Sequence, residues 1–173
     1  IYNGIENSST SIDGKYFAFI SAIKSIDLED VKPLFVTEAE NFITLFPNSV
    51  HTSTVILWLA LIEEEEEKFH SSYMHFRKIL SLYPKSEHLA FALYRTGLTQ
   101  TEQFNEYETA VSTFRKFLIR FSSDTLAAAA QLNIAQIADS KLEDWVQAVS
   151  EYQTFADTYP MDPNAVAGLM RLG

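Results

Sequence analysis

Few residues of this chain have the types and spacing that catalysis or metal binding requires. The 173 residues include no cysteine and four histidines, which excludes thiol chemistry and cysteine-ligated zinc or iron–sulfur sites. His70 and His75 are five residues apart and therefore lie on different faces of a helix, unlike a helical metal pair at i and i+4. No His-Glu-x-x-His, Gly-x-Ser-x-Gly, Walker or dinucleotide-binding glycine pattern occurs. We therefore predict no enzymatic activity, no cofactor and no metal.

Two charged features of the sequence could serve binding. Residues 63–67 are five consecutive glutamates, which indicate either a solvated helix end or a site for a cation or a basic partner. Arg77-Lys78 and Arg115-Lys116 each follow a phenylalanine at equivalent places in the chain. They predict a basic stripe on an outer helix face, which either is simply solvated or meets an acidic partner.

The composition limits the class of protein. A net charge of −10 argues against nucleic acid or an anionic lipid surface as the main partner. The longest uncharged apolar run covers residues 55–62, whereas a membrane-spanning helix needs about 20 residues. No apolar segment of the signal-peptide kind follows Ile1. Five glycines and five prolines leave few turns, so long helices are favoured over a many-stranded sheet.

The elements that must position these residues repeat along the chain. Four similar segments end at Pro47, Pro84, Ser122 and Pro160, which are 37, 38 and 38 residues apart. An aromatic residue precedes each end, and large apolar residues occur five and eight positions before most of them. Spacings of three and four residues place these side chains on one buried helical stripe. Each repeat is thus predicted to end in a helix of about 16 to 18 residues.

A second helical pattern begins after each of these ends. Ser86 and Asp124 are the expected N-caps. Small residues recur thirteen positions after each end and predict a close helix crossing; they are Ala60, Gly97, Ala135 and Gly173. Trp58 and Trp145 are interpreted as core or inter-helix packing. Each repeat is therefore a pair of helices.

The repeats divide the chain as follows. Residues 1–14 are expected to be a flexible lead-in. The repeats cover about 15–49, 50–86, 87–124 and 125–162, and residues 163–173 begin a fifth, so we expect the chain to be a piece of a longer protein. In the first repeat, helices are predicted at 16–26 and 30–46, with Asp30 as cap and Pro33 in the first turn.

The helix pattern resembles that of a known family. Tyr107, Ala110, Phe114, Phe117 and Phe121 fit the second helix of a tetratricopeptide repeat (TPR), as do Trp145, Ala148, Tyr152, Phe155, Tyr159 and Pro160. The resemblance covers roughly residues 15–173. It implies an all-α, right-handed α-solenoid of TPR-like antiparallel helix pairs, in which the first helices line a groove that binds a protein or peptide segment.

A subgroup of that family shares further residues. Tyr83-Pro84-Lys85-Ser86, with Ala90, Tyr94 and Gly97, resembles bacterial envelope scaffolds. These include the lipoprotein of the outer-membrane β-barrel assembly machinery (BamD) and the periplasmic coordinator of the Tol-Pal system (CpoB). The resemblance implies a periplasmic or outer-membrane-associated scaffold, with a cytoplasmic location still open and a lipid anchor possible outside this sequence. Partner identity, organism, total repeat number and oligomeric state are not predicted.

The resemblance and the repeat register together give the groove candidates. They are Thr54, Leu57, Leu61 and Glu64 in the second repeat, Phe91, Tyr94, Arg95 and Leu98 in the third, and Ala129, Leu132 and Gln136 in the fourth. An aromatic residue and an arginine often dominate binding energy at such a surface. Alternatively, Phe91 and Leu57 pack between repeats. Two other functions stay open, namely a TPR lipoprotein that binds a small apolar ligand and a docking module of a larger multidomain protein.

Overall fold

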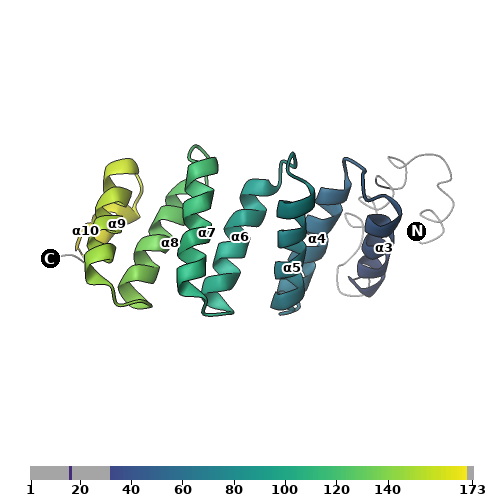
Figure 1. Ribbon diagram of the computed structural model, residues 1–173, viewed down its shortest axis with the longest axis horizontal. Helices are drawn as coiled ribbons and strands as arrows, with labels where there is room; N and C mark the ends of the chain where they lie inside the picture. Colours follow the sequence, from purple (N-terminus) through teal and green to yellow (C-terminus); the bar gives the residue numbers. More distant parts are fainter. Residues whose placement is uncertain (1–15, 17–31, 171–173) are drawn as a thin grey trace. The chain divides into compact units, whose positions relative to one another are not determined.

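The computed structural model describes residue 16 and residues 32–170, and the regular secondary structure of this part is α-helical. The helices, labelled as in Figure 1, belong to two compact units, residues 1–88 and 89–173. The N-terminal unit contains α3 (Lys32–Leu45), α4 (Thr52–Glu65) and α5 (Phe69–Leu82). The C-terminal unit contains α6 (Leu89–Glu102), α7 (Tyr107–Arg120), α8 (Ala127–Ser140), α9 (Trp145–Thr158) and α10 (Asn164–Met170).

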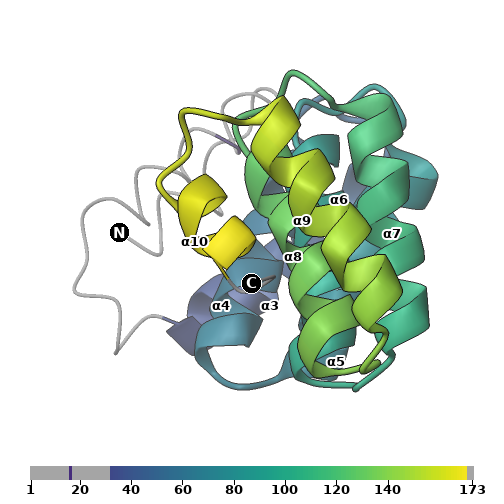
Figure 2. The same ribbon diagram turned by 90° about the vertical axis from the view of Figure 1, so that its left-hand side faces the viewer.

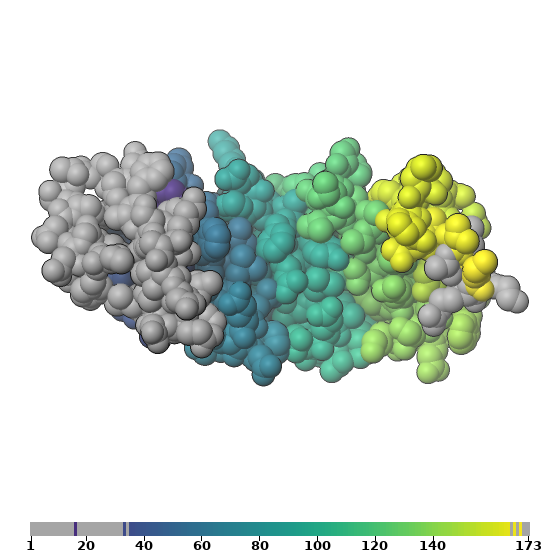
Figure 3. Space-filling view, turned by 180° about the vertical axis from the view of Figure 1, so that it is seen from behind, coloured from purple at the N-terminus to yellow at the C-terminus, as the bar shows by residue number. Residues whose placement is uncertain are grey.

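Within each unit, consecutive helices pack side by side in antiparallel order. In the N-terminal unit α4 packs against both α3 and α5, and in the C-terminal unit each helix packs against the next, down to α10 beside α9 (Figure 2). On the face seen in Figure 3, side chains fill the spaces between the helices of the C-terminal unit, whose colours run from teal at α6 to yellow at α10. The fold is an α-solenoid of TPR-like helix pairs, as the repeat predicts.

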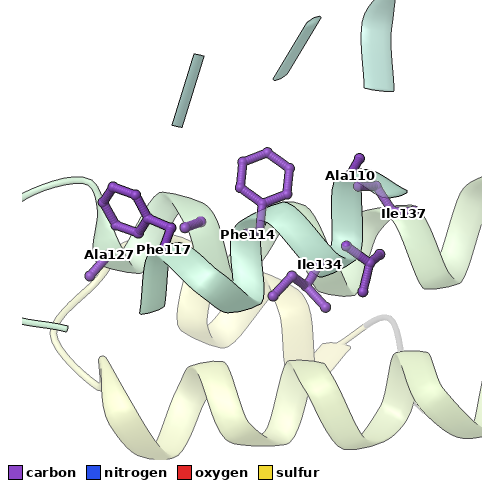
Figure 4. Close-up of a cluster of buried hydrophobic side chains, with 8 residues drawn as sticks. Ala110, Phe114, Phe117, Ala127, Ile134 and Ile137 are labelled. Atoms are coloured by element: carbon purple, nitrogen blue, oxygen red, sulfur yellow. The ribbon is translucent and has the colours of Figure 1, made fainter. Parts of the chain in front are cut away.

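The aromatic stripe of the sequence forms the core of the C-terminal unit. Phe114 and Phe117 of α7 are fully buried beside Ile134 and Ile137 of α8 (Figure 4). The apolar stripe of a helix must be covered by its neighbours. Besides α8, the helix α6 covers this cluster, with residues such as Leu93. The predicted burial of the phenylalanine positions is therefore confirmed here.

The second helix of each pair is shorter than predicted. The helices α3, α5, α7 and α9 each have 14 residues. In the last three, the aromatic residue before the repeat end is already the C-cap, with its backbone N–H bonded four residues back. The predicted 16 to 18 residues were wrong because the stripe includes this aromatic, which packs against the core after the helix has ended.

The entry into each first helix uses one side chain at the same repeat position. Its oxygen accepts a hydrogen bond from the backbone N–H two residues further on, at 2.8 to 3.2 Å; the four residues are Ser49, Ser86, Asp124 and Asp162. Ser86 and Asp124 were predicted as N-caps. They instead close the turn that leads into the helix, because α6 and α8 begin three residues later, at Leu89 and Ala127.

Gly97 allows the close helix crossing that the sequence predicts. A Cβ atom added there would lie 2.8 Å from Phe114 Cε1, so only glycine permits this distance between α6 and α7. The equivalent Ala60 and Ala135 are fully buried. Gly173, the helix predicted at 16–26, the cap Asp30 and the lead-in at 1–14 lie outside the described residues, except for Tyr16.

Candidate partner-binding face

Two first helices of the C-terminal unit share one face. Asn133 Nδ2 on α8 donates a hydrogen bond of 3.3 Å to Tyr94 Oη on α6, and therefore the two helices present neighbouring side chains. We define the α6–α8 face by the repeat positions around this contact; its residues are Phe91, Tyr94, Arg95 and Leu98 of α6 with Ala129, Leu132, Asn133 and Gln136 of α8. Gln136 is exposed and the other seven are half-buried.

Part of this face belongs to the core below it. The ring of Tyr94 lies 5.7 Å from that of Phe114 and 6.0 Å from that of Phe117, measured between centroids, and burial raises the pKa of its phenol. Leu98 packs against the same cluster, and Leu132 packs against two neighbouring clusters. These three side chains thus hold the face in shape as well as forming its surface.

The remaining side chains give the face its chemistry. Arg95 carries a guanidinium group, which suits carboxylates and carbonyl oxygens. Asn133 Nδ2 also donates to Ala129 O at 2.8 Å, which fixes the orientation of its amide, while the exposed Gln136 offers a second amide. With Phe91 beside them, these groups can bind both the backbone and an apolar side chain of a peptide.

The candidates of the N-terminal unit lie on α4. Thr54, Leu57, Leu61 and Glu64 are all half-buried. The hydroxyl of Thr54 lies 2.9 Å from His88 Nε2, so part of its hydrogen-bonding capacity is used within the unit. Burial lowers the pKa of His88, an effect that nearby Glu87 partly opposes.

The interpretation of both tryptophans as packing residues was wrong. Trp58 is 39% exposed and Trp145 is 66% exposed. Trp145 is the first residue of α9, at the repeat position of Phe69 and Tyr107, which are half-buried. Trp58 lies one position after Leu57, at the edge of the candidate face of α4.

Two residues of these faces were not among the groove candidates predicted from the sequence. Trp58 and Asn133 occupy the repeat position of Arg95, being 37 residues before it and 38 residues after it. The signal was therefore present, because the repeat that selected Arg95 also aligns these two. They were missed because a tryptophan in an apolar run resembles a core residue, and an asparagine resembles a solvated one.

The first residue of the acidic run 63–67 is buried, unlike a residue of a solvated helix end. Glu63 is 7% exposed, and its carboxylate accepts hydrogen bonds from Ser71 Oγ at 2.6 Å and from His75 Nδ1 at 2.7 Å. The carboxylate thereby joins α4 to α5. Glu65, Glu66 and Glu67 are exposed, and Glu66 pairs with Lys68 at 2.7 Å.

The two basic pairs have different surroundings. Arg115 forms an ion pair of 2.8 Å with Glu151, whereas the guanidinium of Arg77 lies over the ring of Tyr73, 5.8 Å from its centroid. Lys116 is exposed and Lys78 is half-buried. Each pair lies on an outward side of its own helix.

Within residue 16 and residues 32–170, no group of three or more histidine, aspartate or glutamate side chains could hold a metal ion. Across the same part of the chain, no helix combines the length and the apolar character needed to cross a membrane.

Comparison with known proteins agrees with this geometry. Residues 91–123, which contain most of α6 and all of α7, match a family model described as Tetratricopeptide repeat. This segment is thus similar to a tetratricopeptide repeat. A solved structure described as "MamA RS-1 ArsTM double mutant" superposes with a TM-score of 0.59, covering 89% of this chain and 81% of that chain. At 15% identity this likeness concerns the fold alone. No curated protein matches the sequence.

Proposed function

We propose that this protein is a non-enzymatic scaffold that binds a segment of a partner protein on the α6–α8 face. The hydrogen bond between Asn133 and Tyr94 carries the proposal, because it joins α6 and α8 into one surface that displays Phe91 and Arg95. The surface is already formed before a partner arrives, so binding orders few side chains and costs little entropy.

The repeat match supports this assignment. Residues 91–123 include the four α6 residues of the face, and TPR pairs present their first helices to ligands. The candidates of α4, with Trp58 added, are proposed as the corresponding surface of the N-terminal unit. Tryptophan and arginine are enriched among residues that dominate binding energy.

We also propose that the scaffold serves a bacterial cell-envelope assembly, periplasmic or associated with the outer membrane. This part rests on the resemblance of residues 83–86, Ala90, Tyr94 and Gly97 to the envelope subgroup. Fractionation of cells that express the full-length protein tests it, and recovery of the protein in the cytoplasmic fraction would contradict it.

Site-specific photo-crosslinking tests the binding face. A photoreactive amino acid at the exposed Gln136, and in a second variant at Phe91, should trap the same partner in cells. The matched control carries the group at Ile119, which is 85% exposed on α7. If Ile119 traps the partner and the two face positions do not, the α6–α8 face is not the binding site.

Substitution gives a second test without disturbing the core. Arg95→Ala should weaken binding of the trapped partner by about five- to thirtyfold, as for truncation of a central interface arginine. Tyr94 is unsuitable for this purpose, since its ring packs on Phe114 and Phe117. Arg120→Ala, on an exposed residue of α7, is the control.

A further inference from the structure

One side of α5 differs in charge from the rest of the chain. Residues 68–86 contain Lys68, Arg77, Lys78 and Lys85 but no aspartate or glutamate, in a protein whose net charge is −10. Lys68 is neutralised by Glu66. Among the residues that the structure describes, no carboxylate lies within ion-pair distance of the other three cations.

The unpaired cations of α5 contrast with their equivalent in the next repeat. Arg115 occupies the repeat position of Arg77 and is paired with Glu151. One repeat earlier, the position of Glu151 is held by Thr113, whose hydroxyl donates to Gln100 instead. The sequence therefore provides a counter-charge for Arg115 and omits it for Arg77.

Arg77 and Lys78 lie on the side of α5 that faces away from α4, and Lys85 follows the end of the helix at Leu82. The buried residues of the helix are Ser72, Phe76 and Ile79. The helical period places Met74, Arg77, Lys78 and Ser81 on the opposite side. This side also has apolar surface, because Met74 is 50% exposed and Leu82 is 62% exposed.

Two hollows border this surface, and Leu82 lines both. The first, of about 480 Å³, is lined by Met74, His75, Arg77, Lys78, Ser81 and Leu82. The second, of about 530 Å³, lies between residues 47–50 with Ser53 and residues 82–86. A hydrogen bond of 2.9 Å from Tyr83 Oη to Pro47 O joins these two loops. We name the combined area the α5 surface.

The imidazole in the first hollow is fixed in place. The carboxylate of the buried Glu63 accepts a hydrogen bond from His75 Nδ1, which holds the ring between α4 and the hollow. The α5 surface therefore has a fixed imidazole at its floor and three cations. Met74, Lys78 and Leu82, at positions i, i+4 and i+8, form a ridge that another helix can pack against. The two ends of this ridge are exposed apolar side chains and its middle is a cation.

We propose that the α5 surface is a second docking site, which binds an acidic amphipathic helix of a partner protein. The three cations provide charge complementarity for glutamates on that helix, and the ridge and hollows receive its apolar side chains. An anionic membrane fits less well, because an extended charged surface would also approach the acidic parts of a chain whose net charge is −10, whereas a single helix meets only the α5 surface. A second copy of this chain fits less well for the same reason. The inference concerns a different face from the proposed function and does not depend on it.

Binding of a designed peptide to the full chain tests the proposal. The probe is a labelled helical peptide of about 18 residues with leucines on one face and glutamates beside them, compared with the same peptide in which every glutamate is glutamine. Fluorescence anisotropy should show binding of the glutamate peptide, weaker binding of the glutamine peptide, and a further loss when salt rises from 50 to 200 mM, since screening shortens the reach of surface charges.

Two pairs of matched variants locate the site. Lys78→Glu should weaken binding by about three- to tenfold, as expected for reversing one interfacial charge. Lys116→Glu, the same change at the equivalent position of α7, should leave the affinity within about twofold. Likewise Leu82→Ser should weaken binding, whereas Ile119→Ser on α7 should not.

Several outcomes would overturn the proposal. They are no binding of the glutamate peptide, equal losses for Lys78→Glu and Lys116→Glu, and binding of anionic phosphatidylglycerol vesicles in place of the peptide. Self-association of the chain that Lys78→Glu abolishes, seen by sedimentation, would assign the surface to a second copy instead. Arg95→Ala should not change peptide binding, which separates this site from the α6–α8 face.

Discussion

Single side chains adjust how the two helices of each repeat are joined. Glu63 and His75 form a hydrogen bond between α4 and α5, and Gln100 and Thr113, at the same repeat positions, form one between α6 and α7. The third pair is Ala138 and Glu151. Because alanine cannot bond to it, the Glu151 carboxylate accepts hydrogen bonds from Gln131 Nε2 and Arg115 instead. The residues at this position thus bond within their own helix pair in all three cases, and Glu151 of the third pair also forms an ion pair with α7 of the preceding repeat.

At the residue scale, the hydroxyl of Ser72 is the clearest local defect. It is fully buried, and in the described part of the chain it has no hydrogen-bond partner. Its repeat equivalents Ala110 and Ala148 are also buried. An unsatisfied buried hydroxyl costs about 1 to 3 kcal/mol, so Ser72→Ala should raise the free energy of unfolding by about 1 kcal/mol or more in urea titration.

The control is Ser112→Ala at an exposed position of α7, which isolates the helix propensity of alanine. An equal gain in both variants would show that the Ser72 hydroxyl carries no penalty.

At the scale of elements, the turn inside each helix pair has one residue in the left-handed region. Its φ is 58° at Glu67, 55° at Asn105 and 53° at Glu143, and the three residues are spaced by 38 positions. Asparagine tolerates this conformation, whereas a residue with a long side chain is strained there by about 1–2 kcal/mol. The last glutamate of the acidic run is therefore a turn residue, which charge patterning alone did not indicate.

Glycine should relieve the strain in these turns. Glu143→Gly is expected to raise the free energy of unfolding by about 0.5 to 1 kcal/mol, because the gain in the folded state exceeds the added flexibility of the unfolded chain. Thermal denaturation followed by circular dichroism measures it. Asn105→Ala at the equivalent turn should do the opposite. A loss of stability in Glu143→Gly would mean that the turn is not strained.

At the helix crossing, replacing Gly97 by alanine should lower the free energy of unfolding, although alanine has the better helix propensity. Gly97→Ala favours the helix by up to about 1 kcal/mol, yet the new methyl group would meet the ring of Phe114 at 2.8 Å. Overpacking of this kind costs about 1–3 kcal/mol or more, so a net loss of stability is expected in urea titration. Adding Phe114→Leu should reduce the penalty of Gly97→Ala, since the smaller side chain leaves room. If Gly97→Ala is stabilising in the wild-type background, the close crossing is not rigid.

Much of the arrangement of elements follows from the sequence, because the repeat fixes which side chains are buried. The burial of Phe76, Phe114 and Phe155 was predictable from spacing alone. The exposure of Trp145 was not, since its repeat equivalents Phe69 and Tyr107 are half-buried, and periodicity alone does not distinguish the three. The hydrogen bonds of Glu63 were not predictable either, because they depend on a partner twelve residues away on another helix.

At the scale of the whole molecule, stability is shared among similar small cores that each helix completes for its neighbour. The protein carries 23 acidic and 13 basic residues, so protonation of carboxylates makes its negative net charge smaller in magnitude as the pH falls. Any specific effect of a histidine must therefore be separated from this general one. The separation requires a variant with the same carboxylates.

His88 permits such a separation. Burial lowers its pKa below the ordinary 6.5, despite the opposing effect of Glu87, and its Nε2 lies 2.9 Å from the Thr54 hydroxyl. The unfolded chain therefore binds a proton more readily than the folded one. It follows that the stabilisation from neutral His88 is fully present above about pH 6.5 and is lost as the pH falls through the lower folded-state pKa. We expect the midpoint of thermal unfolding to fall further between pH 7.5 and pH 5 in the wild type than in His88→Gln, which cannot take up the proton. Parallel pH profiles for the two proteins would show that His88 titrates alike in the folded and unfolded chain.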